Sequence, residues 1–299
     1  MQKGQYPGVE AVELKGRVSA NKYLLLRRTV QLSLLLLFLL GPWFGIWIIK
    51  GNIASSLTLE VIPLTDPLLL LQVLLTGHSP EIQAIQGAAI VFIFYLIFGG
   101  RTFCSWVCPI NMVTDFASWL RFKLGIKTSM TFPRRTRHWM LGAILLLALI
   151  TGSLAWEIVN PVSLVYRGLI FGMGMAWAIV IAILLMDVFI TRHGWCGHLC
   201  PVGSFYSLIG RFSLLRINAV NRDACNDCMD CYAICPESRV IKPVLNGRPE
   251  SSPIIMSGQC TNCGRCIDVC SKDVFVFSSR FSNVLPTQEG SIKPREVSS

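Results

Sequence analysis

Eight cysteines in the C-terminal third of the chain fall into two runs with the same spacing. The runs are Cys225-x2-Cys228-x2-Cys231-x3-Cys235-Pro236 and Cys260-x2-Cys263-x2-Cys266-x3-Cys270-Ser271. This spacing is typical of bacterial two-cluster ferredoxins, in which the fourth cysteine of each run ligates the other cluster. The sequence therefore predicts two [4Fe–4S] clusters. The expected ligands are Cys225, Cys228, Cys231 and Cys270 for the first cluster, and Cys260, Cys263, Cys266 and Cys235 for the second.

Other cysteine chemistries fit these two runs less well. Disulfides between cysteines so close in sequence would mostly need strained rings. Zinc sites use paired C-x2-C elements, but a third cysteine at the same spacing in both runs is unusual for them. Ser271 stands where the ferredoxin pattern has a proline, a difference that alters the turn without removing a ligand. One-electron transfer is therefore the chemistry that the runs favour.

The remaining four cysteines form a second, repeated motif with the spacing C-x3-C-P, and each pair follows an aromatic residue. They are Cys104, Cys108, Cys196 and Cys200. Cysteines four apart lie on one face of a helix, so two such pairs could supply four thiolates to a third redox centre. They could instead cycle between dithiol and disulfide, or be small residues at a helix end. We favour a functional role because duplicated cysteines in a reducing compartment are seldom mere packing residues. His193 and His198 are weaker ligand candidates.

Four apolar stretches must position these cysteines. They lie at residues 30–49, 84–100, 139–156 and 169–190, and each approaches the ~20 residues that cross a hydrocarbon core of ~30 Å. Apolar residues make up 53% of the chain and charged residues only 15%, which is low for a soluble protein. The only ionisable residue inside these stretches is Asp187. The sequence predicts an α-helical membrane protein with four transmembrane helices, followed by a small α+β ferredoxin domain.

The distribution of basic residues predicts the orientation. The first and third connecting loops carry only Lys50 and Arg167, whereas the N-terminal segment, the middle loop and the C-terminal part carry the rest. By the positive-inside rule both termini are cytoplasmic. The net charge of +10 is thereby explained by topology, and nucleic-acid binding is not favoured. Arg27 and Arg28 are interpreted as the basic flank of the first span rather than as a twin-arginine export signal.

The membrane part repeats itself. Each half consists of a span, a loop, a second span and a C-x3-C-P motif, so the halves are expected to be parallel repeats whose axis brings the two cysteine pairs together. Residues 113–123 and 204–214, after the motifs, are expected to be interfacial helices or to pack on the soluble domain. The predicted organisation is an N-terminal arm (1–29), a four-helix membrane domain (30–215), a ferredoxin domain (216–283) and a tail (284–299).

No haem is expected, because no C-x-x-C-H motif occurs and the four histidines do not suit a bis-histidine site across the bilayer. A quinol would need a proton acceptor near the membrane. Acidic and imidazole candidates in the loops are Glu60, Asp66, His78, Glu81 and Glu157. For each of them, a solvated loop residue or helix cap is the favoured interpretation. The sequence does not identify the quinol site or the quinone.

The chain resembles the NapH family, the membrane-bound ferredoxin-type subunits of periplasmic nitrate reductase systems. The resemblance covers nearly the whole chain, and its clearest segments are residues 41–45, 62–68, 103–109, 160–164, 193–198 and 225–231. It implies a component of a quinol dehydrogenase in a bacterial inner membrane, rather than a stand-alone enzyme. Such a subunit takes electrons from membrane quinol and passes them through the periplasmic ferredoxin NapG, towards the tetrahaem cytochrome NapC and nitrate reductase. The alternatives are assembly or redox sensing of a partner enzyme, or a passive anchor.

Overall fold

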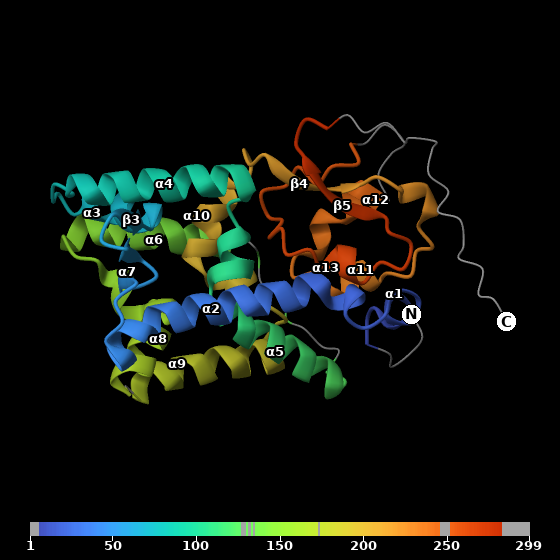
Figure 1. The fold of residues 1–299 in the computed structure, drawn as a ribbon, viewed down its shortest axis with the longest axis horizontal. Helices are drawn as coiled ribbons and strands as arrows, with labels where there is room; N and C mark the ends of the chain where they lie inside the picture. The colour runs from blue at the N-terminus through green and yellow to red at the C-terminus, as the bar shows by residue number, and fades with distance from the viewer. Residues whose placement is uncertain are drawn as a thin grey trace.

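The computed structural model describes residues 6–126, 130, 133, 135–172, 174–245 and 252–282, so the predicted tail (284–299) lies outside them. Figure 1 shows a bundle of long helices at one end and a smaller, mixed domain at the other. The first half contains α1 (Val9–Lys15), η1 (Ser19–Asn21), α2 (Lys22–Phe44), β1 (Ile49–Gly51), β2 (Ser55–Thr58), β3 (Ile62–Thr65), α3 (Pro67–Leu75), α4 (Ile82–Phe98), η2 (Phe103–Val107) and α5 (Ile110–Lys123). The second half contains α6 (Thr136–Thr151), α7 (Ala155–Val159), α8 (Pro161–Phe171), α9 (Gly174–Leu185), η3 (Met186–Ile190), η4 (Trp195–Leu199) and α10 (Pro201–Ile209). The small domain contains β4 (Leu215–Ala219), η5 (Arg222–Ala224), α11 (Asp230–Ile234), η6 (Ser238–Val240), α12 (Lys242–Leu245), α13 (Arg265–Asp268) and β5 (Phe275–Ser279).

The long helices overlap the four predicted apolar stretches, but the helices and the predicted stretches differ in length. Within the described residues, the helix Ser19–Phe44 is the one long and apolar enough to cross a membrane, and α4 and α6 are shorter. The fourth stretch is not one continuous helix. Gly172 adopts φ +65°, ends α8 and is followed by α9, because glycine is readily accommodated in this left-handed conformation.

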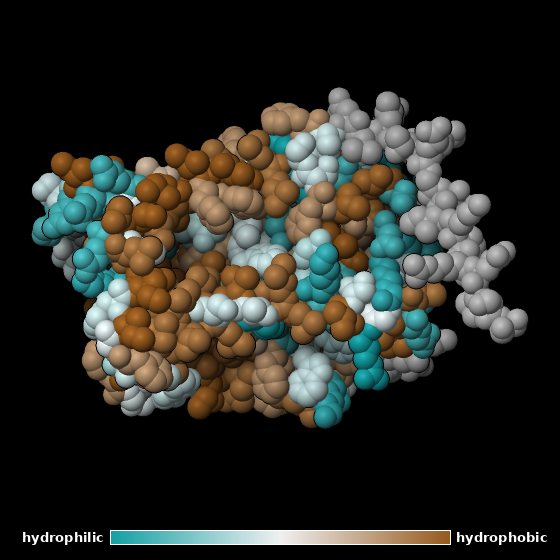
Figure 2. All heavy atoms as spheres, viewed as in Figure 1, coloured by the Kyte–Doolittle hydropathy of each residue, from teal (hydrophilic) through white to brown (hydrophobic). Residues whose placement is uncertain are grey.

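The helical end of the molecule carries an apolar surface. Large side chains on its helices are more than half exposed, among them Leu36, Ile93, Trp139 and Ile150. Figure 2 shows apolar side chains over α2, α4 and α9, while hydrophilic residues gather at the end beyond α4 and over the small domain. A contiguous apolar surface of this kind is unusual for a soluble monomer and suits lipid or another apolar partner.

The loop between the first two predicted spans contains structure that the sequence did not indicate. β1, β2 and β3 form an antiparallel meander, with Ser55 paired to Thr65 and Thr58 to Ile62. Gly87 on α4 permits close packing against this sheet, since a Cβ at that position would lie 3.0 Å from the Thr65 nitrogen. The sheet is therefore held against the side of α4, and β3 leads directly into α3.

The two helices that follow the cysteine motifs pack differently. α10 is almost entirely buried, with Tyr206 only 1% exposed, and it packs mainly against α6 and α4 of the helical bundle rather than on the small domain. α5 buries Ala117 but leaves Phe116 and Trp119 largely exposed, and Lys123 lies over the Trp119 ring. The exposed aromatic face of α5 suits an apolar–aqueous interface.

The small domain has the expected α+β character. β4 and β5 pair antiparallel, with Ile217 opposite Phe277, over a core formed with α11, α13 and neighbouring segments. The predicted N-terminal arm is not separate from it, because Asp268 accepts hydrogen bonds from the backbone N–H groups of Tyr23 and Leu24, both at 3.1 Å. The carboxylate lies at the N-terminal end of α2, where unpaired N–H groups favour an anion. The small domain is thereby fixed to the helical bundle.

Candidate metal centres

Four of the eight ferredoxin-pattern cysteines line one small cavity of the small domain. They are Cys225, Cys228, Cys231 and Cys270. The loop that carries the first three is folded by two left-handed residues, Asp227 at φ +52° and Met229 at φ +66°. Cys270 comes from the other run, and its sulfur accepts a hydrogen bond of 3.4 Å from the Val274 N–H. The structure thus brings the first predicted ligand set together across the two runs.

The other four cysteines line a second cavity. They are Cys235, Cys260, Cys263 and Cys266. Cys235 is placed there by α11, whose C-terminal end it caps. The second loop uses Asn262 at φ +47° and Gly264 at φ +71°, at positions equivalent to Asp227 and Met229 in the first. The fourth cysteine of each run therefore faces the other run.

The protonation of these thiols is shifted by their surroundings. Burial, followed by neighbouring cysteines, raises the pKa of Cys231 to about 12, and burial raises the pKa of Cys260 to about 11. Buried thiols lose hydration when they ionise, so they remain protonated in the polypeptide alone. Thiolates bind iron–sulfur clusters, so cluster binding would displace these protons. Four soft donors around each cavity fit a [4Fe–4S] cluster in donor type and number.

The C-x3-C-P cysteines also converge. Each motif contains a π-helical turn, at Phe103–Val107 in the first and Trp195–Leu199 in the second. In each turn the N–H of the cysteine before the proline donates to the carbonyl of the aromatic residue, at 3.0 Å from Cys108 to Phe103 and 2.9 Å from Cys200 to Trp195. One cavity is lined by all four motif cysteines, Cys104, Cys108, Cys196 and Cys200. Among the described residues, no three His, Cys, Asp or Glu side chains form a site for a single metal ion. The motif cysteines therefore share one cavity, as the repeat predicted.

A buried ion-pair network, here called the arginine–glutamate network, joins the second motif to the small domain. Arg101 donates to Glu237 at 3.0 Å and Arg137 donates to the same oxygen at 3.4 Å, with all three side chains at most 2% exposed. Arg101 also donates to the Cys196 carbonyl at 3.2 Å and to the Gln259 carbonyl at 2.9 Å. Charge counting predicted only a topological role for the basic residues of the middle loop, although Arg101 lies just before the first motif.

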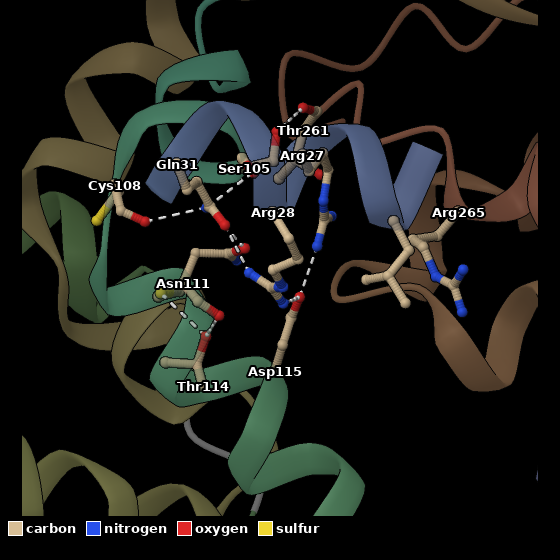
Figure 3. Close-up of polar contacts among 12 residues, drawn as sticks. Arg27, Arg28, Gln31, Ser105, Cys108, Asn111, Thr114, Asp115, Thr261 and Arg265 are labelled. Atoms are coloured by element: carbon tan, nitrogen blue, oxygen red, sulfur yellow. Dashed lines mark hydrogen bonds and ion pairs between the residues drawn. The ribbon is translucent and has the colours of Figure 1, made fainter. Parts of the chain in front are cut away.

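The first motif is fixed by a second polar network, shown in Figure 3. Arg27 and Arg28 reach from α2 to Asp115 on α5, at 2.6 and 2.5 Å. Gln31 donates to the carbonyls of Ser105 and Cys108, at 3.1 and 3.2 Å. These contacts give Arg27 and Arg28 a structural role in positioning the motif, beyond that of a basic flank.

The first motif also contacts the small domain directly. The Ser105 hydroxyl donates to the Thr261 carbonyl at 2.7 Å, and the Trp106 indole N–H donates to the Asn262 carbonyl at 3.0 Å. Thr261 and Asn262 lie between Cys260 and Cys263. The C-x3-C-P cavity and the second ferredoxin cavity are therefore connected by short polar contacts.

The other sequence candidates have different roles. Asp187 accepts a hydrogen bond of 3.1 Å from the Trp195 N–H and so supports the second motif. Glu157 accepts hydrogen bonds from Asn160 and Ser163, at 3.0 and 2.6 Å, beside the loop before α8. His193 is buried, with φ +50°.

Loop residues are divided between the surface and the interior. Glu60 is exposed and pairs with Lys50, and His78 lies 3.1 Å from the Thr76 hydroxyl. Asp66 caps the N-terminus of α3 by accepting from the Leu68 N–H at 2.9 Å. It also accepts a hydrogen bond of 3.1 Å from the Tyr206 hydroxyl, which distinguishes it from an ordinary loop cap.

A much larger apolar cavity, of about 700 Å³, lies between α2 and α4. Its lining includes Leu34, Phe38, Phe94 and Phe98, with Asp66 among its few polar residues. Its size is that of cavities that enclose organic cofactors and ligands. Phe103 lines both this cavity and the one formed by the motif cysteines.

Comparisons with known proteins agree with the cysteine pattern. Residues 84–127 and 171–218 match the family described as "4Fe-4S binding domain", and residues 224–274 match "4Fe-4S dicluster domain". The chain is 47% identical to the "Ferredoxin-type protein NapH" of Haemophilus influenzae, over 93% of this chain and 97% of that protein. It is 46% identical to the "Ferredoxin-type protein NapH" of Escherichia coli, over 92% of this chain and 96% of that protein. It is 52% identical to the "Methylamine utilization ferredoxin-type protein MauN" of Paracoccus denitrificans, over 90% of this chain and 95% of that protein. No solved structure matches.

Proposed function

This chain belongs to the NapH/MauN-type family of iron–sulfur electron-transfer proteins, and we propose that it takes electrons from a membrane quinol and passes them to a periplasmic ferredoxin-type partner. The observation that carries the proposal is the convergence of the eight ferredoxin-pattern cysteines into two groups of four. Bound [4Fe–4S] clusters would supply one-electron redox chemistry at these groups.

The ligand assignment follows the cavities. Cys225, Cys228, Cys231 and Cys270 would hold one cluster, and Cys235, Cys260, Cys263 and Cys266 the other. Two left-handed residues in each loop support the three close cysteines of each group. The shared fourth ligands would tie the two halves of the small domain together. The C-x3-C-P cysteines would form a third redox centre, supported by their common cavity.

The helical part would be a membrane domain of four spans with both termini in the cytoplasm. The exposed apolar surface and the scarcity of lysine and arginine in two of the loops support this placement. The short helices α4 and α6 would be completed at their ends by the adjoining loops and caps. The electron donor would then be a quinol dissolved in the bilayer, close to the large cavity between α2 and α4.

The electron acceptor depends on the soluble partner system. By analogy with NapH, we propose the periplasmic ferredoxin NapG, with transfer onward through the tetrahaem cytochrome NapC towards periplasmic nitrate reductase. A second candidate is methylamine metabolism, which is favoured by the 52% identity to a MauN protein. Growth of a deletion strain on nitrate without oxygen and on methylamine distinguishes the two.

The proposal is tested with anaerobically purified protein. Addition of quinol should produce the EPR signals of reduced clusters, and the signals should decay when the ferredoxin partner is added. Clusters that stay oxidised with a quinol of sufficiently low potential would contradict electron transfer from quinol. If the protein acts in assembly or sensing instead, deletion of its gene would lower the cofactor content of the partner enzyme rather than only slowing electron flow.

A further inference from the structure

The cavity between α2 and α4 has one polar end in otherwise apolar walls. Leu34 and Phe38 of α2 and Val91 and Phe94 of α4 line the sides. In Figure 1, α4 runs along the upper edge of the bundle and α2 through its middle, and in Figure 2 apolar side chains lie over both helices. A ligand that enters here must be predominantly apolar, because the walls offer few hydrogen-bond partners.

The polar end is a built hydrogen-bonding site. The Leu68 N–H and the Tyr206 hydroxyl both donate to one oxygen of Asp66, Oδ1, at 2.9 and 3.1 Å. Tyr206 is only 1% exposed, and its ring is held against those of Tyr95 and Phe103, with centroid distances of 5.0 and 5.1 Å. The geometry therefore fixes the Asp66 carboxylate at the wall of an apolar cavity, with its second oxygen able to accept a further hydrogen bond.

The cavity also approaches two of the cysteine sites. Phe103 precedes Cys104 in the chain and separates this cavity from that of the C-x3-C-P cysteines. At its other end the cavity is bounded by Asn262, which precedes Cys263 in the second ferredoxin loop. A cavity that served only to accommodate a lipid tail would need neither the Phe103 contact, nor the Asn262 contact, nor a partly buried carboxylate.

We infer that this cavity binds the head group of a quinol, with one ring hydroxyl donating to the Asp66 carboxylate beside Tyr206 and the isoprenoid chain leaving between α2 and α4. The inference rests on the proposed function and assigns its substrate site. A quinol combines the required features, since its hydroxyl can donate to the carboxylate while its ring and tail pack against aromatic and aliphatic walls. A lipid acyl chain lacks the hydrogen-bonding group that Asp66 would meet.

Conservative substitutions separate the polar contact from folding. Asp66→Asn keeps a good N-cap for α3 but removes the carboxylate charge. Tyr206→Phe keeps the ring packing and removes the hydroxyl. Val91→Trp reduces the volume of the cavity while leaving both polar side chains unchanged. Glu60→Gln is the matched control, because Glu60 lies on the same loop but is exposed and paired with Lys50.

The experiment measures binding of decylubiquinol and of a short-chain menaquinol, both kept reduced without oxygen, to the full-length protein in nanodiscs, by quenching of tryptophan fluorescence. Trp106 lines the cavity and serves as the local reporter. Retained iron and gel-filtration behaviour verify that each variant is folded. Loss of the charge-assisted hydrogen bond should raise the Kd of Asp66→Asn at least about tenfold, with a smaller rise for Tyr206→Phe. Val91→Trp should abolish saturable binding, and Glu60→Gln should match wild type.

The possible failures are distinguishable. If wild type binds either quinol and the three cavity variants bind it equally well, the assigned site is wrong while oxidation of quinol by this protein stands. The same conclusion follows if only Val91→Trp weakens binding, because Asp66 and Tyr206 would then not hold the head group. If folded wild type binds neither quinol, the proposed function itself is contradicted and this site with it.

Discussion

Neutralising Glu237 tests how the small domain is attached to the helical bundle. This carboxylate is 2% exposed and accepts from Arg101 and Arg137, whose side chains are each 1% exposed. Glu237→Gln keeps the size of the side chain but removes the negative charge that pairs with two buried guanidinium groups. Breaking a buried ion pair in this way typically costs about 3–5 kcal/mol, far more than the loss of a surface pair.

The assay is thermal unfolding of the purified protein in detergent, followed by circular dichroism at one scan rate. The expected loss corresponds to a fall in the midpoint on the order of 10 °C. Glu60→Gln is the control, because its exposed pair with Lys50 should contribute little. A double variant, Arg101→Gln with Glu237→Gln, should be less destabilised than the sum of the single variants, since it also removes a stranded charge.

The reasoning is refuted if Glu237→Gln unfolds at the same temperature as wild type and as Glu60→Gln. Strictly additive effects in the double variant would also contradict it, because two groups in direct contact should be coupled. Either result would mean that the arginine–glutamate network does not stabilise the junction between the second motif and the small domain.

Three further predictions concern the cysteines. Cys270→Ser should abolish the EPR signal of the cluster held by the first run, and Cys235→Ser should abolish the EPR signal of the cluster held by the second run. Each variant should lose about half of the ferredoxin iron. Loss of the signal belonging to the same run as the substituted cysteine would contradict the crosswise assignment. Serine at all four C-x3-C-P positions should lower the iron content without removing the two ferredoxin signals, and unchanged iron in a folded variant would argue against a third centre. In iron-free protein at pH 8, iodoacetamide should alkylate Cys231 and Cys260 more slowly than in the urea-unfolded chain, and the alkylation rate should increase towards pH 11. The reason is that burial raises the pKa of both thiols and only the thiolate reacts. Equal alkylation rates in the folded and unfolded chains, measured by mass spectrometry, would contradict this.

The cysteine groups were predictable from sequence because their geometry is mostly local. Three cysteines at two-residue intervals must line one loop, and the position of the fourth follows from the repeat of the run. The duplicated C-x3-C-P motif likewise predicted that two pairs would meet, and all four cysteines line one cavity. The helices α2, α4 and α6 overlap the predicted apolar stretches, and α9 lies within the fourth, because long apolar runs favour helices.

The rest depends on contacts between residues distant in sequence. The break at Gly172 was missed because a lone glycine in an apolar run does not by itself indicate a helix end. The β1–β3 meander is stabilised by close packing on Gly87, which the loop sequence alone does not show. The arginine–glutamate network and the Asp66–Tyr206 contact each join segments separated by more than a hundred residues, so hydropathy and charge counting could not reveal them.

The central claim is most directly tested by iron and acid-labile sulfide analysis, with EPR, on full-length protein purified without oxygen. The account predicts iron and sulfide in equal amounts, at least enough for two [4Fe–4S] clusters per chain, and a reduced spectrum broadened by interaction between the clusters. Protein that is folded but contains no iron, or zinc in its place, would contradict it.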